Sequence, residues 1–156
     1  MAAEVGNPAP DFTLPGSDST DAGRRSYSLA ELRGQAVVLV FYPGDSTPVC
    51  TRQLNAYTED IDSFTDVGAQ VLAISPQSVA SHDEFSCKQG GFGFPLLADT
   101  DKAVGEAYGI LGPLGFYRRS AFVVDAAGIV RYAHKAVAGL TFRSTDELVK
   151  AVQAAS

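Results

Sequence analysis

Cysteine is scarce in this chain of 156 residues, which contains only Cys50 and Cys87. The CxxC pair that dithiol exchange normally uses is absent, and so are the short Cys/His spacings of zinc sites. His82 and His134 could be imagined as further ligands, but neither lies at a ligand spacing from a cysteine. We therefore predict no metal ion and no other cofactor.

Long apolar runs and an excess of basic residues are also missing. No run of about 18 apolar residues occurs, so we predict no transmembrane helix. Eighteen acidic residues against twelve basic ones give a net charge of −6, which argues against nucleic acid or an anionic membrane as the main partner. The start of the chain lacks the basic and apolar regions of a signal peptide, so we expect a cytoplasmic protein. Cysteines are kept reduced there, and a pair of them is more often redox-active than structural.

Four aliphatic runs predict buried strands, at residues 36–42, 69–75, 120–125 and 128–134. A tight hairpin is expected between the last two. Because helical patterns separate the earlier strands, we predict an α/β fold with a mixed sheet, mostly parallel in its centre and antiparallel at one edge. The chain length suits a single domain, residues 1–156, that buries roughly 70% of its unfolded surface.

The predicted helices carry recognisable start signals. Residues 48–64 show one apolar stripe, and residues 81–89 open with a capping box formed by Ser81 and Glu84. Ser144 and Glu147 form a second box before a closing helix. Asp99 and Asp101 lie near turns and are expected to be solvated.

The segment YPGDSTPVCT places Cys50 in the first turn of the helix after a buried strand. Thr47 is the expected N-cap and Pro48 the first helical residue, where a missing N–H costs nothing. We expect the Thr47 oxygen to accept the Cys50 N–H, leaving the hydroxyl hydrogen for a molecule that meets the sulfur. The apolar stripe, extended back from Leu54, turns Cys50 inward at the end of the strand, where α/β proteins commonly place active sites.

An activated thiol at this position requires a cation. A cysteine with the ordinary pKa of about 8.5 is only a few per cent thiolate at neutral pH. A helix N-terminus supplies about 0.3–1 kcal/mol, and burial opposes ionisation, whereas a cation about 4 Å away contributes on the order of 4 kcal/mol. Arg52 points to another side of the helix, so the cation must come from elsewhere in the chain. Without one, Cys50 would be only a small buried apolar residue.

Together these residues resemble the active-site pattern of the peroxiredoxin family, Pro-x-x-x-Thr-x-x-Cys, carried by Pro43, Thr47 and Cys50. More narrowly they resemble the branch called bacterioferritin comigratory protein or peroxiredoxin Q. The stretches SHDEFSCKQGGFGFPLLADTDKAVGEAYGI and RSAFVVDAAGIVRYA extend the resemblance over most of the chain. The resemblance implies a thioredoxin-like fold and a peroxidase that reduces hydroperoxides at Cys50.

The resemblance also implies roles for other residues. It places the activating cation at Arg119, with Arg118 as a surface charge. It implies that Thr47 hydrogen-bonds the peroxide and that Pro43 shields the pocket. The implied partners are a hydroperoxide substrate and a thioredoxin-type reductant, and the branch is often monomeric.

Two positions depart from the branch. Many members have a resolving cysteine five residues after the first, where this chain has Asn55. A glutamate is often found three residues after the first cysteine, where this chain has Gln53, and this change puts an accessory hydrogen bond in doubt. Cys87 is therefore the candidate resolving cysteine of an intramolecular disulfide. Because the Cα atoms of a disulfide lie about 4.4–6.8 Å apart, we expect both helices to unwind locally on oxidation.

Two alternatives stay open. An external thiol would resolve Cys50 if Cys87 is only a packing residue. The chain would instead be a thioredoxin-fold protein for binding or dithiol exchange if Cys50 does not react with peroxide.

Overall fold

The computed structural model describes residues 3–18, 23–112, 114–136 and 142–155. Within these ranges the strands are β1 (Thr13–Asp18), β2 (Gly23–Ser28), β3 (Ala36–Phe41), β4 (Ala69–Ser75), β5 (Leu96–Ala98), β6 (Ser120–Val124) and β7 (Val130–Lys135). The helices are α1 (Pro48–Glu59), α2 (Ile61–Asp66), α3 (Val79–Lys88), α4 (Ala103–Ala107) and α5 (Thr145–Ala154), with a short 3-10 helix, η1 (Ala30–Leu32).

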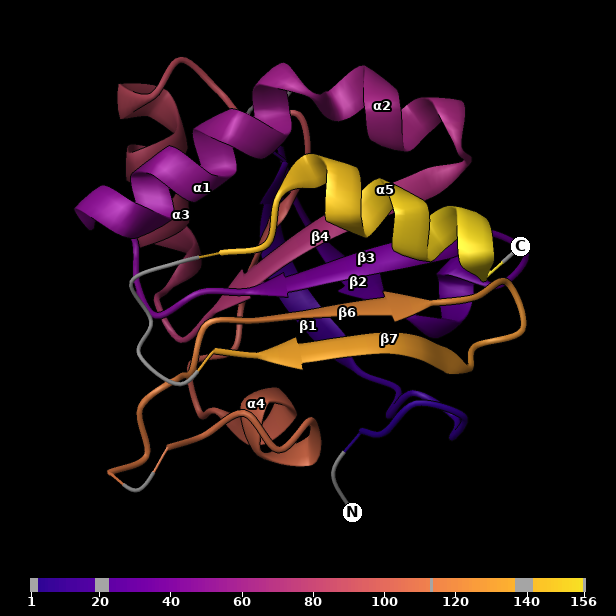
Figure 1. Cartoon of the computed structure of the whole chain (residues 1–156). Helices are drawn as coiled ribbons and strands as arrows, with labels where there is room; N and C mark the ends of the chain where they lie inside the picture. The colour runs from indigo at the N-terminus through magenta and orange to yellow at the C-terminus, as the bar shows by residue number, and fades with distance from the viewer. Residues whose placement is uncertain (1–2, 19–22, 113, 137–141, 156) are drawn as a thin grey trace.

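The strands form one mixed sheet in the order β2-β1-β5-β4-β3-β6-β7 (Figure 1). The three central strands β5, β4 and β3 are parallel, and antiparallel pairs flank them on both sides. The predicted α/β fold is therefore confirmed, together with the hairpin of β6 and β7. The parallel centre brings the carboxyl ends of β3 and β4 to one edge of the sheet, where the loops before α1 and α3 begin.

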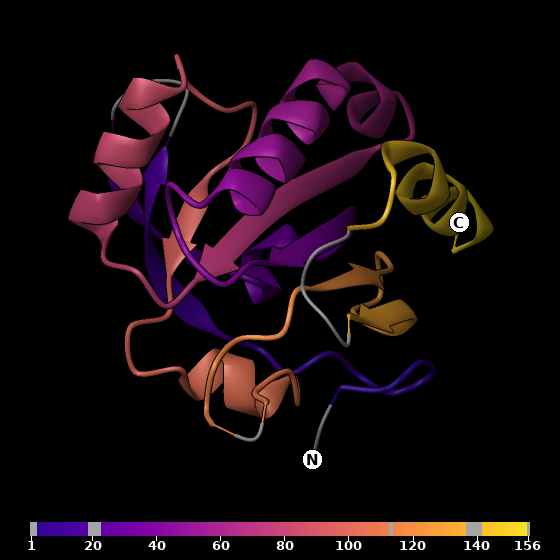
Figure 2. The ribbon, with the colours of Figure 1, turned by 60° about the vertical axis from the view of Figure 1, so that its left-hand side comes forward.

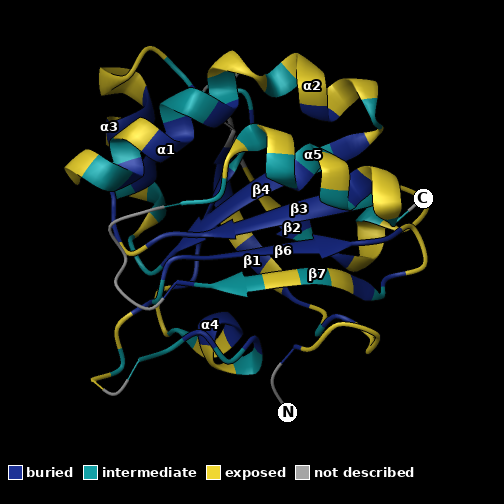
Figure 3. Cartoon of the chain, viewed as in Figure 1, coloured by how far each residue is buried: buried dark blue, intermediate teal, exposed yellow. Residues whose placement is uncertain are grey.

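Both faces of the sheet are covered. Along β3, Val38 and Val40 pack toward α1, α2 and α5, whereas Val37, Leu39 and Phe41 pack toward α4 and the N-terminal segment. This alternation follows from the two-residue period of a strand, and it explains why β3 reads as a continuous aliphatic run. Figure 3 shows the buried strands between helices whose outer faces are exposed.

Three strands leave no clear pattern in the sequence. In β1, Pro15 and Gly16 interrupt the apolar residues, and β2 is largely polar. Gly16 has a tertiary reason, because a Cβ atom there would lie 2.8 Å from the ring of Tyr27 on β2. The third, β5, has only three residues and is too short for a periodicity to be recognised.

Two helix predictions need correction. The helix predicted over residues 48–64 is broken at Asp60 into α1 and α2, although Phe64 continues the buried stripe of α1. The helix predicted from Ser81 begins at Val79, because the side chain of Ser78 accepts the N–H of Ser81 and is the N-cap. The second predicted cap is confirmed, since Ser144 accepts the N–H of Glu147.

The prediction that Asp99 is solvated is wrong. Its side chain is fully buried and accepts hydrogen bonds from the N–H groups of Val104 and Gly105 and from the hydroxyl of Tyr117. A carboxylate is stable there because the first N–H groups of α4 have no partner within the helix. Asp101, by contrast, is exposed as expected.

None of the helices in the described part of the chain has the length and hydropathy needed to cross a membrane.

Candidate active site

Cys50 lies in the first turn of α1, just after the loop of residues 42–47 that follows β3. Thr47 is the N-cap of α1 and Pro48 its first residue, as the sequence predicts. The Cys50 side chain is fully buried and belongs to the same apolar cluster as Leu54 and Tyr57 of α1. The thiol therefore faces the sheet from the N-terminal end of a helix.

Strand pairing brings Arg119 to this place. In the antiparallel pair of β3 and β6, Phe41 lies opposite Ser120, so Arg119 lies beside the start of the loop that leads to Cys50. Residues two apart on a strand share a face. Arg119 thus shares the face of Ala121, which packs in the same cluster as Cys50. Arg118 points away, and its Nε donates to the carbonyl of Ala136.

The Arg119 guanidinium bridges two acceptors on successive turns of α1. Its Nη2 donates to Cys50 Sγ over 3.2 Å, and its Nη1 donates to Gln53 Oε1 over 2.5 Å. A guanidinium only donates, and its hydrogen bonds strengthen when the acceptor carries negative charge, so this contact favours a thiolate. Only 4% of Arg119 is exposed, which limits screening of its charge by water.

Gln53 takes the hydrogen-bonding role that the sequence put in doubt. Its carbonyl holds Arg119, and its amide nitrogen lies 3.4 Å from the hydroxyl of Tyr57. Tyr57 in turn donates to the carbonyl of Arg143. Burial raises the pKa of Tyr57 to about 12, so it remains a donor. Because Gln53 is uncharged, this contact does not neutralise the positive charge of Arg119.

Thr47 and Pro43 both lie on the loop of residues 42–47, and both are exposed. The predicted hydrogen bond from the Cys50 N–H to the Thr47 side chain is absent. The Thr47 hydroxyl instead donates back to the carbonyl of Gly44 over 3.2 Å. The loop turns sharply at Ser46, whose φ of 62° is left-handed, and this turn presents the hydroxyl to the loop carbonyl rather than to the helix.

Cys87 lies on a different helix from Cys50. It is exposed near the end of α3, and both cysteines are reduced thiols. Figure 2 shows α3 standing beside α1 on the same side of the sheet. Asn55 of α1, at the position where the family resemblance led us to look for a resolving cysteine, donates to the side chain of Gln89, the C-cap of α3.

A buried polar network also surrounds the loop of residues 42–47, and sequence reasoning missed it. Asp45 accepts hydrogen bonds from the hydroxyls of Tyr42 and Ser81 and contacts His82 Nδ1, each over 2.7 Å. Burial raises the pKa of Tyr42 well above its ordinary value, and the neighbouring Asp45 carboxylate adds to the effect. One sequence signal was available, because His82 lies three residues before the buried Phe85 on the inner side of α3.

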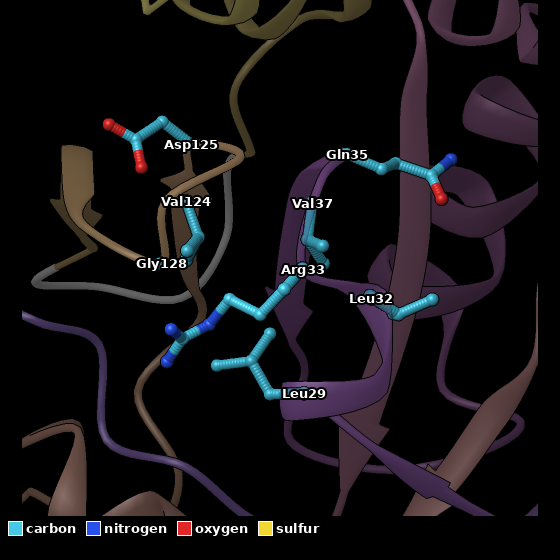
Figure 4. Close-up of a pocket in the computed structure, with 8 residues that line it drawn as sticks. All are labelled: Leu29, Leu32, Arg33, Gln35, Val37, Val124, Asp125 and Gly128. Carbon is cyan, nitrogen blue, oxygen red and sulfur yellow. The ribbon is translucent and has the colours of Figure 1, made fainter.

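A groove at the opposite end of β3 offers no comparable chemistry. It is lined by residues in and beside η1, at the start of β3, and at the end of β6 and the turn that follows it (Figure 4). Arg33 fills the space beside Gly128, where an added Cβ atom would lie 2.6 Å from the guanidinium. In the ranges that the structure describes, no cluster of three or more His, Cys, Asp or Glu side chains could hold a metal ion.

Known proteins resemble the chain over most of its length. The AhpC/TSA family pattern matches residues 5–133. Peroxiredoxin-2 of Rattus norvegicus is 38% identical over 160 aligned positions, which include 97% of this chain and 79% of the rat protein. The chloroplastic peroxiredoxin Q of Oryza sativa subsp. japonica is 37% identical over 83% of this chain and 58% of its own length.

The solved structures agree. Reduced 2-Cys peroxiredoxin of Plasmodium vivax superposes with a TM-score of 0.86 at 27% identity, over 96% of this chain and 94% of that one. The family expected from the sequence is thus confirmed by sequence and by fold. The chain belongs to the AhpC/TSA family, as one of its peroxiredoxins, which are thiol-dependent peroxidases.

Proposed function

We propose that Cys50 is the peroxidatic cysteine and that it reduces hydrogen peroxide and organic hydroperoxides. The observation that carries this proposal is the contact of Arg119 with Cys50 Sγ at the first turn of α1. The thiolate attacks one peroxide oxygen, the O–O bond breaks, and Cys50 becomes a sulfenic acid. The other oxygen takes up a proton and leaves as water or as an alcohol.

Arg119 has two roles in this step. It stabilises the thiolate before the reaction, and its guanidinium lies where charge develops as the O–O bond breaks. Gln53 positions it for both roles through the hydrogen bond to Nη1. The backbone N–H groups of Val49 and Cys50, at the start of α1, would help to hold the departing oxygen.

Thr47 and Pro43 complete the proposed site. The Thr47 hydroxyl donates its hydrogen to Gly44, so its oxygen remains an acceptor for the O–H of a peroxide. Pro43 would shield the site from water. Because Cys50 is fully buried while Pro43 and Thr47 are exposed, we infer that peroxide enters through a local opening of this loop.

We propose further that Cys87 resolves the sulfenic acid. Its sulfur would attack Cys50, forming a disulfide and releasing water, and a thioredoxin-type reductant would restore both thiols. The end of α3 suits this role, since Cys87 is exposed and Gly90 and Gly91 end the helix with φ of 79° and 93°. We expect the end of α3 and the first turn of α1 both to unwind, because Cys50 is buried on one helix and Cys87 is exposed on the other.

The test compares peroxide consumption by the wild type, Cys50→Ser and Cys87→Ser in the presence of thioredoxin and its reductase. We expect no consumption by Cys50→Ser. Cys87→Ser should complete one turnover with peroxide and continue only when a small thiol is added. Turnover of Cys87→Ser at the wild-type rate with thioredoxin would instead assign resolution to an external thiol. A monomeric state and a cytoplasmic location stay predictions.

A further inference from the structure

His82 is a buried titratable residue that the proposed mechanism does not use. Its side chain is fully buried in α3 and contacts hydrogen-bonding groups at both ring nitrogens. Nε2 lies 2.9 Å from the carbonyl of Leu97 on β5, and Nδ1 lies 2.7 Å from Asp45 Oδ2. The imidazole therefore joins three segments: the end of the sheet, α3 and the loop before Cys50.

The protonation of this pair follows from its partners. A carbonyl can only accept, so Nε2 carries a hydrogen. Asp45 already accepts from the hydroxyls of Tyr42 and Ser81, and a contact of 2.7 Å to Nδ1 requires a proton between the two atoms. His82 Nδ1–H thus donates to Asp45, which is also the acceptor for the two hydroxyls, and the Tyr42 hydroxyl lies 3.4 Å from the same nitrogen. Such a pair is retained inside a protein only when its geometry is good and its other polar atoms are satisfied.

Asp45 is held by contacts of both its side chain and its backbone. Besides these three contacts, its backbone N–H donates to the side chain of Gln77, in the connection between β4 and α3. Thr47, the N-cap of α1, lies two residues further on, with Ser46 in a left-handed conformation between them. The position of Asp45 consequently determines where the chain enters α1 and where Cys50 lies.

We propose that His82 is a positioning residue for the Cys50 reaction: paired with Asp45, it holds the loop of residues 42–47 against α3 and β5. This inference rests on the proposed peroxidase function of Cys50. A displacement of about 1 Å in a reacting group can cost on the order of 100-fold in rate, so loss of the pair slows peroxide reduction without touching the thiol or Arg119.

The first test is independent of activity. In reduced protein labelled with ¹⁵N-histidine, His82 should show protons on both ring nitrogens at neutral pH, and Asp45→Asn should remove the Nδ1 proton. His134, which is only half-buried and whose pKa is lowered by burial and by Arg143, serves as the internal comparison. A single ring proton on His82 in the wild type would overturn the assignment.

The second test measures the rate of Cys50 oxidation in a Cys87→Ser background, where resolution plays no part. We expect His82→Asn to react at least about tenfold more slowly, with Asp45→Asn as a milder variant that keeps the side-chain shape but replaces one acceptor oxygen with a donor. Ser17→Ala is the matched control, because it removes a different hydrogen bond that holds α3, from Ser17 to Asp83. It should stay within about twofold of the parent.

The outcomes separate the two proposals. A parent that does not oxidise at Cys50 refutes the proposed function, while the ring-proton measurement still reports on the pair. Rates of His82→Asn and Asp45→Asn equal to the parent overturn the positioning role. If Ser17→Ala slowed Cys50 oxidation as much as His82→Asn, any loss of a hydrogen bond to α3 would slow the reaction, and the specific positioning role of His82 would be overturned as well.

Discussion

Replacing Arg119 with methionine should slow the reaction of Cys50 with hydrogen peroxide by at least about 100-fold at neutral pH. The guanidinium nitrogen lies 3.2 Å from the sulfur. At an effective dielectric constant of about 20, two unit charges at that separation attract by about 5 kcal/mol. If half of this is lost to the desolvation of the buried cation, about 2.6 kcal/mol remains, which corresponds to roughly two decades at about 1.36 kcal/mol per decade.

The assay is stopped-flow measurement of the single-turnover reaction with hydrogen peroxide, together with the ultraviolet absorbance of the thiolate at the same pH. Arg119→Lys keeps the charge but cannot contact Cys50 and Gln53 with a planar fork, so we expect a rate between those of methionine and arginine. Arg118→Met is the matched control, since Arg118 donates to Ala136 and does not face the thiol. A rate for Arg119→Met within about threefold of the wild type would refute the reasoning, and so would equal slowing by Arg118→Met.

Three further results are expected. An alkylating agent should modify Cys87 before Cys50 in the reduced protein, because only Cys87 is exposed, as peptide mass mapping over time would show. Replacing Asn55 with alanine removes its hydrogen bond to Gln89, worth about 0.5–1.5 kcal/mol, and should speed disulfide formation about two- to tenfold in rapid-quench experiments if release of the end of α3 limits it. Burial alone would raise the pKa of Asp125, but hydrogen bonds from two backbone N–H groups and an arginine lower it below 3.8. Its stabilising effect is therefore present above that pH and is lost as the pH falls through the lowered pKa, so the gap in urea-unfolding free energy between wild type and Asp125→Asn should narrow on acidification below about pH 4.

Much of the site could be predicted because its signals are local. Thr47, Pro48 and Cys50 are neighbours, and helix-capping chemistry places them correctly at the start of α1. The four aliphatic runs likewise identified β3, β4, β6 and β7, since strands covered on both faces contain few polar residues.

What sequence reasoning missed depends on distant partners. In the sequence His82 lies at no ligand spacing from a cysteine, yet its proposed role comes from Asp45, which is 37 positions away, and from a backbone carbonyl of β5. Asp99 lies near turns in the sequence, and this position predicts a solvated side chain. Its partners are N–H groups at the start of α4, which begins four residues later, and no sequence signal showed that this short helix begins there. A one-residue break at Asp60 leaves the apolar stripe unchanged, so periodicity could not detect it.

Gln53 illustrates a signal that was seen but could not be interpreted. The sequence has an amide where the resemblance led us to expect a glutamate, and only the structure shows that the amide oxygen accepts from Arg119. Residue spacing alone could not identify the cation, because Arg119 is 69 positions from Cys50; the family resemblance named Arg119, and the pairing of β3 with β6 explains how it reaches the sulfur.

The most direct test of the account is to treat the reduced protein with one equivalent of hydrogen peroxide and to measure its intact mass and free thiols without reductant. We expect a loss of about two mass units and no remaining thiol, as a disulfide between Cys50 and Cys87 requires, and no change in Cys50→Ser. A gain of oxygen with Cys87 still free would contradict the two-cysteine mechanism. An unchanged mass with both thiols intact would contradict the peroxidase role of Cys50 itself.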